Sequence, residues 1–150
     1  MIEVRDYRED DFATLVAMGK RFHQESDFAR FEYDPNFLLR IHQAVLTHED
    51  WLCCVAEDRD TIVGMFVGVV QPFWFGPSLH AIDLCLFVDR TRRGSFAALR
   101  LLTYARAWAK ARGAEQLRFG AATGIEPEKS DRFFKGLGFE TAGVLYTMDP

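Results

Sequence analysis

The chain has 150 residues, of which 49% are hydrophobic, and its formal net charge is −4 with a sequence pI near 5.5. This length and apolar content suit one globular domain with a substantial core, so we expect a single domain over residues 1–150. The acidic balance argues against a general nucleic-acid surface, because binding to phosphate backbones needs a clustered excess of basic residues.

The first third of the chain predicts a strand followed by two helices. Residues 2–7 are typical of a short strand, and the acidic run after them marks the first turn of a helix whose apolar residues recur from Phe12 to Phe22. A second helix is expected after Pro35, since proline suits the first turn of a helix and apolar residues then recur at helical spacing. An aromatic connection at residues 28–33 joins the two helices.

Three strands are expected next. Residues 51–57 and 61–71 are apolar and rich in strand-forming residues, and the short polar turn between them indicates an antiparallel hairpin. Residues 80–88 form a further predicted strand, which follows an aromatic loop at residues 72–78.

The last third predicts a helix, a strand, a helix and a strand. Apolar residues recur at steps of three and four over residues 98–109, which indicates a helix with one buried face that ends at Gly113. Residues 116–121 supply a strand, Pro127 opens the last helix, and residues 139–148 form the final predicted strand.

Cysteines, histidines and the amino terminus carry little functional signal. Cys53, Cys54 and Cys85 lie in strand-like runs without a disulfide framework, so we interpret them as core residues. The histidines have no ligand spacing with one another or with the cysteines, so no metal site is expected. Residues 1–6 show no basic lead-in or long apolar run, from which we expect no signal peptide, no membrane span and a cytoplasmic location.

The most informative stretch is residues 88–102, where a predicted strand runs through a basic turn into a helix. Such a turn leaves unpaired backbone N–H groups at the helix start, beside the positive end of the helix dipole and next to Arg92 and Arg93. This combination favours phosphate binding. Taken alone, the same pattern also fits an ordinary turn between a strand and an apolar helix.

The turn resembles the acyl-CoA-binding motif of the GNAT acetyltransferase superfamily, Arg/Gln-x-x-Gly-x-Gly/Ala. Without gaps, Arg93 takes the first position, Phe96 falls where a glycine is expected, and Ala98 takes the last position. Phe96 places a bulky side chain where the family lets the backbone approach the pyrophosphate, although donation by its N–H does not itself need glycine. Residues 133–139 resemble the late Phe-Tyr-x-x-x-Gly-Phe signature of the same family, and the predicted order of elements agrees with it.

The resemblance implies an α/β (α+β) fold in which a mixed, mostly antiparallel sheet of about six to seven strands is flanked by four helices. It implies that the strand at residues 80–88 and the following strand diverge to admit pantetheine. The implied activity is transfer of an acetyl or other acyl group from acetyl-CoA to a primary amine of a small molecule or a protein, by direct attack in a ternary complex. The alternative function is a non-catalytic acyl-CoA-binding or protein-interaction domain.

The same resemblance assigns the cofactor site. Backbone groups around Phe87 and Val88 are expected to bind the pantetheine arm, and an amide near Val88 to polarise the thioester carbonyl. Arg93 and the N–H groups from Ser95 to Ala98 are expected to hold the pyrophosphate. The implied cofactor-binding residues are Phe87, Val88, Arg93, Gly94, Ser95, Phe96, Ala97 and Ala98. The other interpretation of Arg92 and Arg93 is a solvated pair.

An incoming ammonium must lose a proton before it attacks, so a carboxylate near the thioester is a sensible general base. Asp83 is the candidate, because it interrupts an apolar strand and the family often places an acidic base early in this strand. The structural alternative is an ion-paired carboxylate on the sheet face. The tyrosine that protonates the leaving thiolate in the family is replaced by Phe134, which leaves water, Tyr146 or Cys85 as substitutes.

Acceptor recognition in the family comes from the connection between the first two helices and from the loop before the motif strand. The candidate acceptor-binding residues are Glu25, Phe31, Tyr33 and Trp74. Carboxylates beside aromatic rings suit a cationic amine through charge pairing and cation–π contact. Alternatively, these aromatic residues close the sheet or form a homodimer contact.

Overall fold

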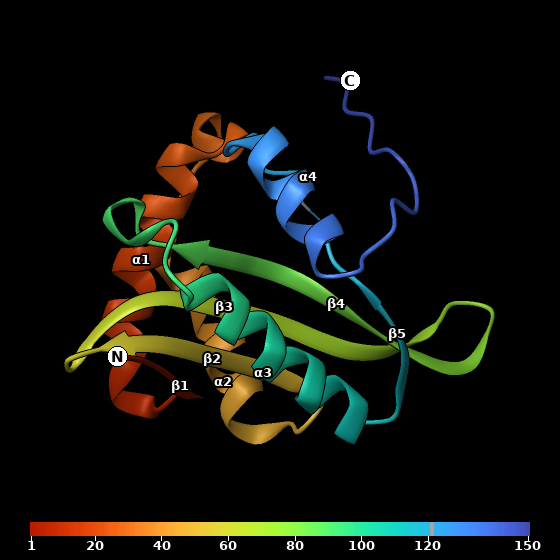
Figure 1. Ribbon diagram of the computed structural model, residues 1–150, viewed down its shortest axis with the longest axis horizontal. Helices are drawn as coiled ribbons and strands as arrows, with labels where there is room; N and C mark the ends of the chain where they lie inside the picture. Colours follow the sequence, from red (N-terminus) through yellow and green to blue (C-terminus); the bar gives the residue numbers. More distant parts are fainter. Residues whose placement is uncertain (121) are drawn as a thin grey trace.

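A sheet of five strands in the order β1-β2-β3-β4-β5 forms the centre of the structure, with helices on both faces (Figure 1). The computed structural model describes residues 1–120 and 122–150. The strands are β1 (Ile2–Asp6), β2 (Trp51–Asp58), β3 (Thr61–Phe73), β4 (Gly76–Val88) and β5 (Ala114–Arg118). The α-helices are α1 (Phe12–Glu25), α2 (Leu38–Thr47), α3 (Ala97–Ala111) and α4 (Pro127–Gly136), and they confirm the four helices predicted from the sequence. Within the described residues, no helix is both long and apolar enough to cross a membrane.

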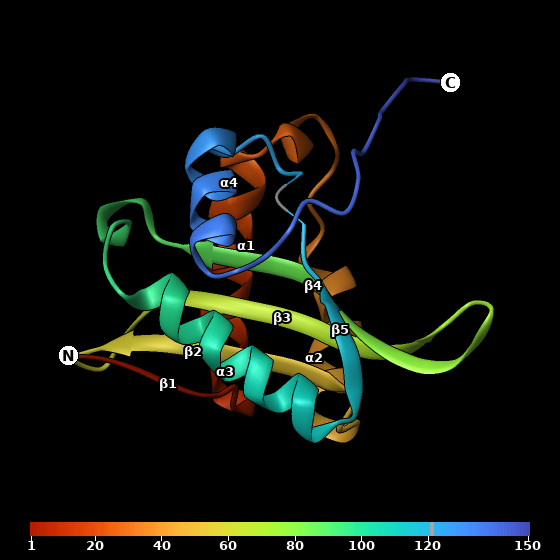
Figure 2. The same ribbon diagram turned by 45° about the vertical axis from the view of Figure 1, so that its right-hand side comes forward.

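The sheet is split along part of its length. Neighbouring strands from β1 to β4 run antiparallel, whereas β5 runs parallel to β4 because α3 crosses over the sheet between them. The β4–β5 pairing extends only from Leu79 to Ile82 on β4. Beyond Ile82, β4 continues to Val88 beneath α4, and no described strand pairs with it on that side (Figure 2). The divergence expected from the sequence is therefore present.

Apolar clusters on both faces hold the helices against the sheet. Phe66 on β3 is fully buried and packs in the cluster that holds α3, together with Leu101. Its neighbours Met65 and Val67 point to the opposite face and pack in the cluster that holds α1, together with Met18. This alternation is the two-residue period of a strand that is covered on both sides. Cys53 and Cys54 are buried in these clusters, which confirms them as core residues.

The hairpin between β3 and β4 is longer than the sequence predicts. Residues 72–78 were expected to form a loop, but pairing continues through Pro72 and Leu79 to Phe73 and Gly76. The Phe73 ring stacks on His80 with centroids 4.1 Å apart, which supports the extended ladder with side-chain contact. The hairpin therefore projects beyond the rest of the sheet (Figure 1).

The prediction of a final strand at residues 139–148 is wrong. The segment has no regular structure, and only Phe139 is packed, against the Phe119 and Phe134 rings. A strand needs the backbone of a neighbour to satisfy its N–H and C=O groups, and no described strand lies beside this segment. Its exposed apolar side chains are Val144, Leu145, Tyr146 and Met148. The sheet consequently has five strands rather than six to seven.

The last strand of the sheet is displaced from its predicted limits. It was expected at residues 116–121 and is found at Ala114–Arg118. The last residue of the prediction, Ala121, lies outside the described residues.

One extra residue in β4 changes its pairing with β3. On β3, Val67 is paired with Cys85. The next residue, Gly68, is paired with Asp83, so Leu84 has no partner and forms a β-bulge. A bulge re-aims the side chains on either side of it, and here it lies where β4 parts from β5.

We expect Gly68→Ala to lower the free energy of unfolding by about 2 kcal/mol, measured by urea denaturation. A Cβ at this position would lie 2.7 Å from Cε1 of Phe66 and 2.8 Å from the carbonyl oxygen of Ile82, so the backbone or the core must shift. Gly143→Ala is the matched control, because nothing lies within 4 Å of a Cβ there. Equal stability of the two variants would contradict this account of the bulge.

Candidate functional site

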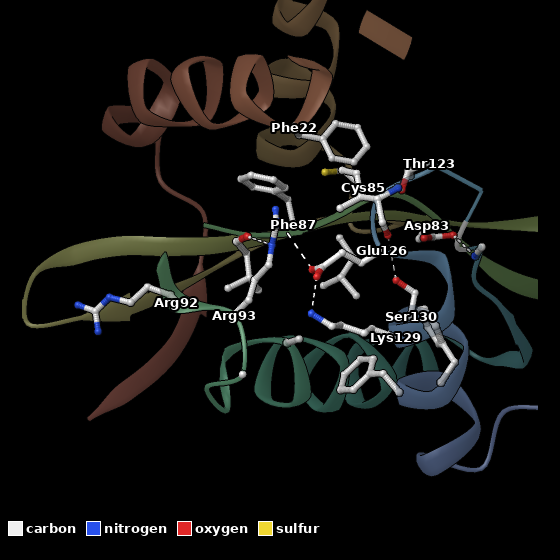
Figure 3. Close-up of a pocket in the computed structure, with 18 of the residues that line it drawn as sticks. Phe22, Asp83, Cys85, Phe87, Arg92, Arg93, Thr123, Glu126, Lys129 and Ser130 are labelled. Atoms are coloured by element: carbon white, nitrogen blue, oxygen red, sulfur yellow. Dashed lines mark hydrogen bonds and ion pairs between the residues drawn. The ribbon is translucent and has the colours of Figure 1, made fainter. Parts of the chain in front are cut away.

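A cavity of about 470 Å³ lies where β4 leaves β5 (Figure 3). Its walls come from the unpaired stretch of β4, the basic turn before α3, the segment before α4 and α4 itself. The lining residues used below are Asp83, Cys85, Phe87, Val88, Arg93, Gly94, Ser95, Ala98, Glu126, Lys129, Ser130 and Phe134. The cavity thus joins the two segments that the sequence singled out, the basic turn and the late Phe-Phe signature.

The edge of β4 from Asp83 to Val88 gives the cavity a polar backbone wall. Because β5 pairs no further than Ile82, this edge has no strand partner among the described residues and can hydrogen-bond an extended ligand. Phe87 and Val88 both line the cavity, as expected. The Val88 carbonyl already accepts a hydrogen bond from Nε of Arg93 at 3.1 Å.

The basic turn opens α3 with a glycine in the left-handed region. Gly94 has a φ of +86°, a conformation that favours glycine, and the turn can therefore reverse without strain. At the helix start, the Ala97 N–H donates to Oγ of Ser95 at 3.3 Å. The Ser95 N–H donates to the Arg92 carbonyl at 3.2 Å. The Ala98 N–H has no backbone acceptor within the described chain, so it is available to a ligand.

Phe96 does not fill the cavity. Its side chain is 69% exposed, and it is absent from the residues that line the cavity. Ala97, the first residue of α3, is buried in the core and also lies off the cavity wall. The turn therefore presents Gly94, Ser95 and Ala98 to the cavity, and the phenylalanine at the glycine position leaves access to them open.

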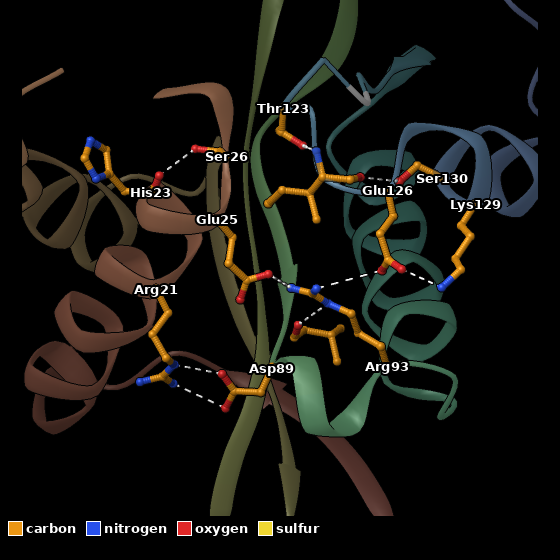
Figure 4. Close-up of polar contacts among 12 residues, drawn as sticks. Arg21, His23, Glu25, Ser26, Asp89, Arg93, Thr123, Glu126, Lys129 and Ser130 are labelled. Carbon is orange, nitrogen blue, oxygen red and sulfur yellow. Dashed lines mark hydrogen bonds and ion pairs between the residues drawn. The ribbon is translucent and has the colours of Figure 1, made fainter. Parts of the chain in front are cut away.

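Arg93 is the central cation of the site (Figure 4). Its Nη2 lies 2.6 Å from Oε2 of Glu25 at the end of α1, and its Nη1 lies 3.8 Å from Oε2 of Glu126 at the start of α4. The guanidinium carbon lies 5.5 Å from the centroid of the Phe87 ring. Arg93 is thus held by carboxylates from both sides of the cavity rather than left in solvent. Arg92 instead pairs with Asp58 at 2.7 Å.

Asp83 stands in the cavity wall without a cation. Its Oδ1 accepts a hydrogen bond from the Gly120 N–H at 2.9 Å, and no described cationic group lies within 4.0 Å of its carboxylate. Burial raises the pKa of Asp83 above its ordinary value, and the Gly120 bond only partly offsets this effect. The ion-pair alternative therefore finds no partner within the described residues.

Two of the groups considered as proton donors differ in position. Cys85 lines the cavity, and burial raises the pKa of its thiol to about 12. Tyr146 is 87% exposed in the irregular carboxyl-terminal segment and lies off the cavity wall. The ring of Phe134 lines the cavity at the position of the late signature.

None of the four residues expected to bind the acceptor is among those that line the cavity. The Glu25 carboxylate forms an ion pair with Arg93. Trp74 is 94% exposed at the tip of the β3–β4 hairpin. The Tyr33 hydroxyl donates to the Val16 carbonyl at 2.7 Å, which ties it to α1. Phe31 is exposed with the Arg30 guanidinium 4.6 Å from its ring centroid.

The polar residues at the start of α4 were not predicted from the sequence. Glu126, Lys129 and Ser130 line the cavity, and Oγ of Ser130 lies 3.4 Å from the Ile125 carbonyl. The signal was the helical spacing: residues 126, 129, 130, 133 and 134 share one face of a helix that begins at Pro127. Phe134 was identified at the position of the family tyrosine, and the residues four and eight positions before it, Ser130 and Glu126, lie on the same side of the helix.

Comparison with known proteins agrees with this geometry. A family model described as the acetyltransferase (GNAT) family matches residues 7–139. No curated protein matches the chain. A transcriptional regulator from Bacillus halodurans C-125 is 21% identical with a TM-score of 0.81, covering 99% of both chains. An aminoglycoside acetyltransferase from an uncultured soil metagenomic sample is 18% identical with a TM-score of 0.76, covering 100% of this chain and 98% of that one. Glucosamine-6-phosphate N-acetyltransferase from Arabidopsis thaliana is 11% identical with a TM-score of 0.78, covering 99% of this chain and 98% of that one.

We expect Asp83→Asn to raise the free energy of unfolding at pH 8 and to change it little at pH 3. The raised pKa means that the ionised carboxylate is less stable in the folded protein than in the unfolded one. The asparagine oxygen keeps an acceptor for the Gly120 N–H but carries no charge. The gain should therefore disappear as the pH falls through the Asp83 pKa, measured by urea denaturation across pH. Glu140→Gln in the exposed terminal segment is the control, and an equal gain in that variant would contradict the explanation.

Proposed function

Because the chain belongs to the GNAT acetyltransferase family, we propose that it is an acyl-CoA-dependent N-acyltransferase that moves an acetyl group from acetyl-CoA to a primary amine of a small molecule or a protein. The observation that carries this proposal is the cavity between the diverging ends of β4 and β5, which runs to the basic turn at the start of α3. The unpaired edge of β4 can hydrogen-bond an extended ligand, and the N-terminus of α3 can bind phosphate groups. Together they suit a long ligand with a diphosphate at one end.

The chain's residues fit acyl-CoA in two parts. The diphosphate would lie at the start of α3. There Arg93 offers a positive charge and the Ala98 N–H offers a hydrogen-bond donor. Gly94, in its left-handed conformation, has no side chain to keep the phosphates away from the backbone. The pantetheine arm would follow the free edge of β4 from Val88 back toward Asp83, hydrogen-bonding the backbone there. Its thioester would then reach the part of the cavity that contains Asp83 and Cys85.

Asp83 is proposed as the general base for the acceptor. Its carboxylate takes a proton from the ammonium, directly or through a water molecule, and the neutral amine attacks the thioester carbonyl carbon. The new C–N bond forms, the C–S bond breaks with its electron pair going to the CoA sulfur, and the surplus proton on the nitrogen passes to water. Burial that raises the Asp83 pKa makes it a stronger base than an exposed carboxylate.

Water is the proposed proton source for the departing thiolate. Phe134 has no proton to give, and Tyr146 lies off the cavity wall. The Cys85 thiol has a pKa of about 12, above the value of about 8.5 for an ordinary thiol, so proton transfer from it to the CoA thiolate would be uphill. The cavity is open to solvent along its rim, where the exposed side chain of Lys129 lies.

A second candidate function is an acyl-CoA-binding domain without turnover. It is favoured by Phe134, a residue that cannot act as an acid at a cavity position where the family uses tyrosine. Both functions require acyl-CoA binding, and only the first requires release of free CoA in the presence of an amine.

Titration with acetyl-CoA tests the binding that both functions share. We expect wild-type protein to bind acetyl-CoA and Arg93→Glu to bind at least about tenfold more weakly, because the charge reversal faces the diphosphate. Lys110→Glu makes the same charge change at an exposed position on α3 and should bind as wild type does. If the Arg93→Glu protein does not fold, Arg93→Gln replaces it in the titration, because glutamine does not place a third carboxylate beside Glu25 and Glu126. Unchanged affinity in a folded Arg93 variant would remove this residue from the site.

A panel of primary amines, with CoA release followed by a thiol reagent, tests turnover. We expect release with at least one amine, and Asp83→Asn should lower kcat by about a hundredfold while acetyl-CoA affinity changes little. In wild type, kcat should rise with pH through a pKa above 3.8, since the base must be ionised and burial raises its pKa. The variant should lack this acidic limb. Binding of acetyl-CoA with no release from any amine would favour the non-catalytic function.

A further inference from the structure

The carboxylate of Glu126 lies between two cations at the mouth of the cavity (Figure 4). Its Oε1 is 2.5 Å from Nζ of Lys129, and its Oε2 is 3.8 Å from Nη1 of Arg93. The second carboxylate, that of Glu25, contacts Arg93 from the other side at 2.6 Å. Two positive and two negative side chains from α1, the basic turn and the start of α4 therefore form one compensated cluster.

The position of Glu126 is maintained at a conformational cost. Its backbone lies in the left-handed region, with φ 42° and ψ 56°, which is unfavourable for a residue other than glycine. Its side chain makes no capping hydrogen bond to α4 that would repay this cost. The ion pair with Lys129 lowers the pKa of Glu126, so the carboxylate stays ionised. Such strained residues concentrate at functional sites.

Arg93 and Lys129 both contact the Glu126 carboxylate, so the place of this carboxylate is a site where an anion can be bound. Any anion that replaced the Glu126 carboxylate there would contact Arg93 and Lys129 together. In the structure the Glu126 carboxylate takes this place, at the end of the cavity where the proposed function puts the diphosphate of acyl-CoA.

We propose that Lys129 is a second cationic ligand of the acyl-CoA diphosphate, and that Glu126 is an internal counter-ion which the diphosphate displaces. This inference rests on the proposed function and adds to it a specific residue pair on α4. Displacement of the Glu126 carboxylate leaves the positive charges of Arg93 and Lys129 facing the two negative charges of the diphosphate. Lys129 then strengthens cofactor binding, and Glu126 weakens it.

The same helix supplies a matched control. Lys135 and Asp131 form an ion pair of 2.8 Å on α4, and neither residue lines the cavity. If the Lys129–Glu126 contact served only to stabilise the helix, neutralising either pair would have the same small effect on ligand affinity.

The experiment compares wild type with Lys129→Gln, Glu126→Gln, Lys135→Gln and Asp131→Asn by calorimetric titration. The ligands are CoA and S-acetyl-pantetheine, which lacks the phosphates. For CoA, we expect about tenfold weaker binding by Lys129→Gln and about threefold to tenfold tighter binding by Glu126→Gln. The Lys135 and Asp131 variants should stay within about twofold of wild type. None of the four variants should alter binding of S-acetyl-pantetheine.

The outcomes separate the inference from the function on which it rests. Wild type that fails to bind CoA overturns the proposed function and this inference with it. Wild type that binds CoA while Lys129→Gln binds equally well, or while Glu126→Gln binds more weakly, overturns this inference alone. All four substitutions are at exposed or partly exposed side chains, and a thermal unfolding curve for each variant shows that it is folded.

Discussion

The cavity exists because the hydrogen-bonded pairing between β4 and β5 ends at Ile82. Up to that residue the two strands share a parallel ladder, and beyond it the β4 backbone has no strand beside it among the described residues. Backbone N–H and C=O groups are costly to leave unpaired in the interior, so such an edge must be open to solvent or to a ligand. The divergence therefore creates the cavity, and the bulge at Leu84 adjusts which β4 residues face it.

Charge compensation is the second feature that shapes the site. The basic turn is tied to α1 by the Arg21–Asp89 pair at 2.9 Å and by the Arg93–Glu25 pair at 2.6 Å, and it reaches α4 through Glu126. These contacts join three segments that are far apart in the chain. They also explain how a protein with a formal charge of −4 presents a cationic group at the cavity without a general basic surface.

The errors of the sequence analysis have identifiable causes. Residues 139–148 have a strand-like composition, yet a strand exists only where a neighbour completes its hydrogen bonds, and no described strand does so. Residues 72–78 contain two prolines and a glycine, which favour a loop, but stacking of Phe73 on His80 extends the hairpin. The structure places Glu25 at the end of α1 with its carboxylate on Arg93, a contact between distant segments that the sequence does not specify, and its role toward the acceptor stays a prediction.

The sequence alone determined the order of the elements as far as α4, the apolar faces of the helices, the burial of Cys53 and Cys54 and the basic turn before α3, because each of these depends on residues near one another in the chain. It also identified Asp83 as an unusual charge within an apolar strand. Only the tertiary structure decided where β4 leaves β5, that Phe96 is exposed beside the cavity, and that Glu126 and Lys129 meet Arg93. Those features depend on strand register and on contacts between distant segments, which local spacing does not specify.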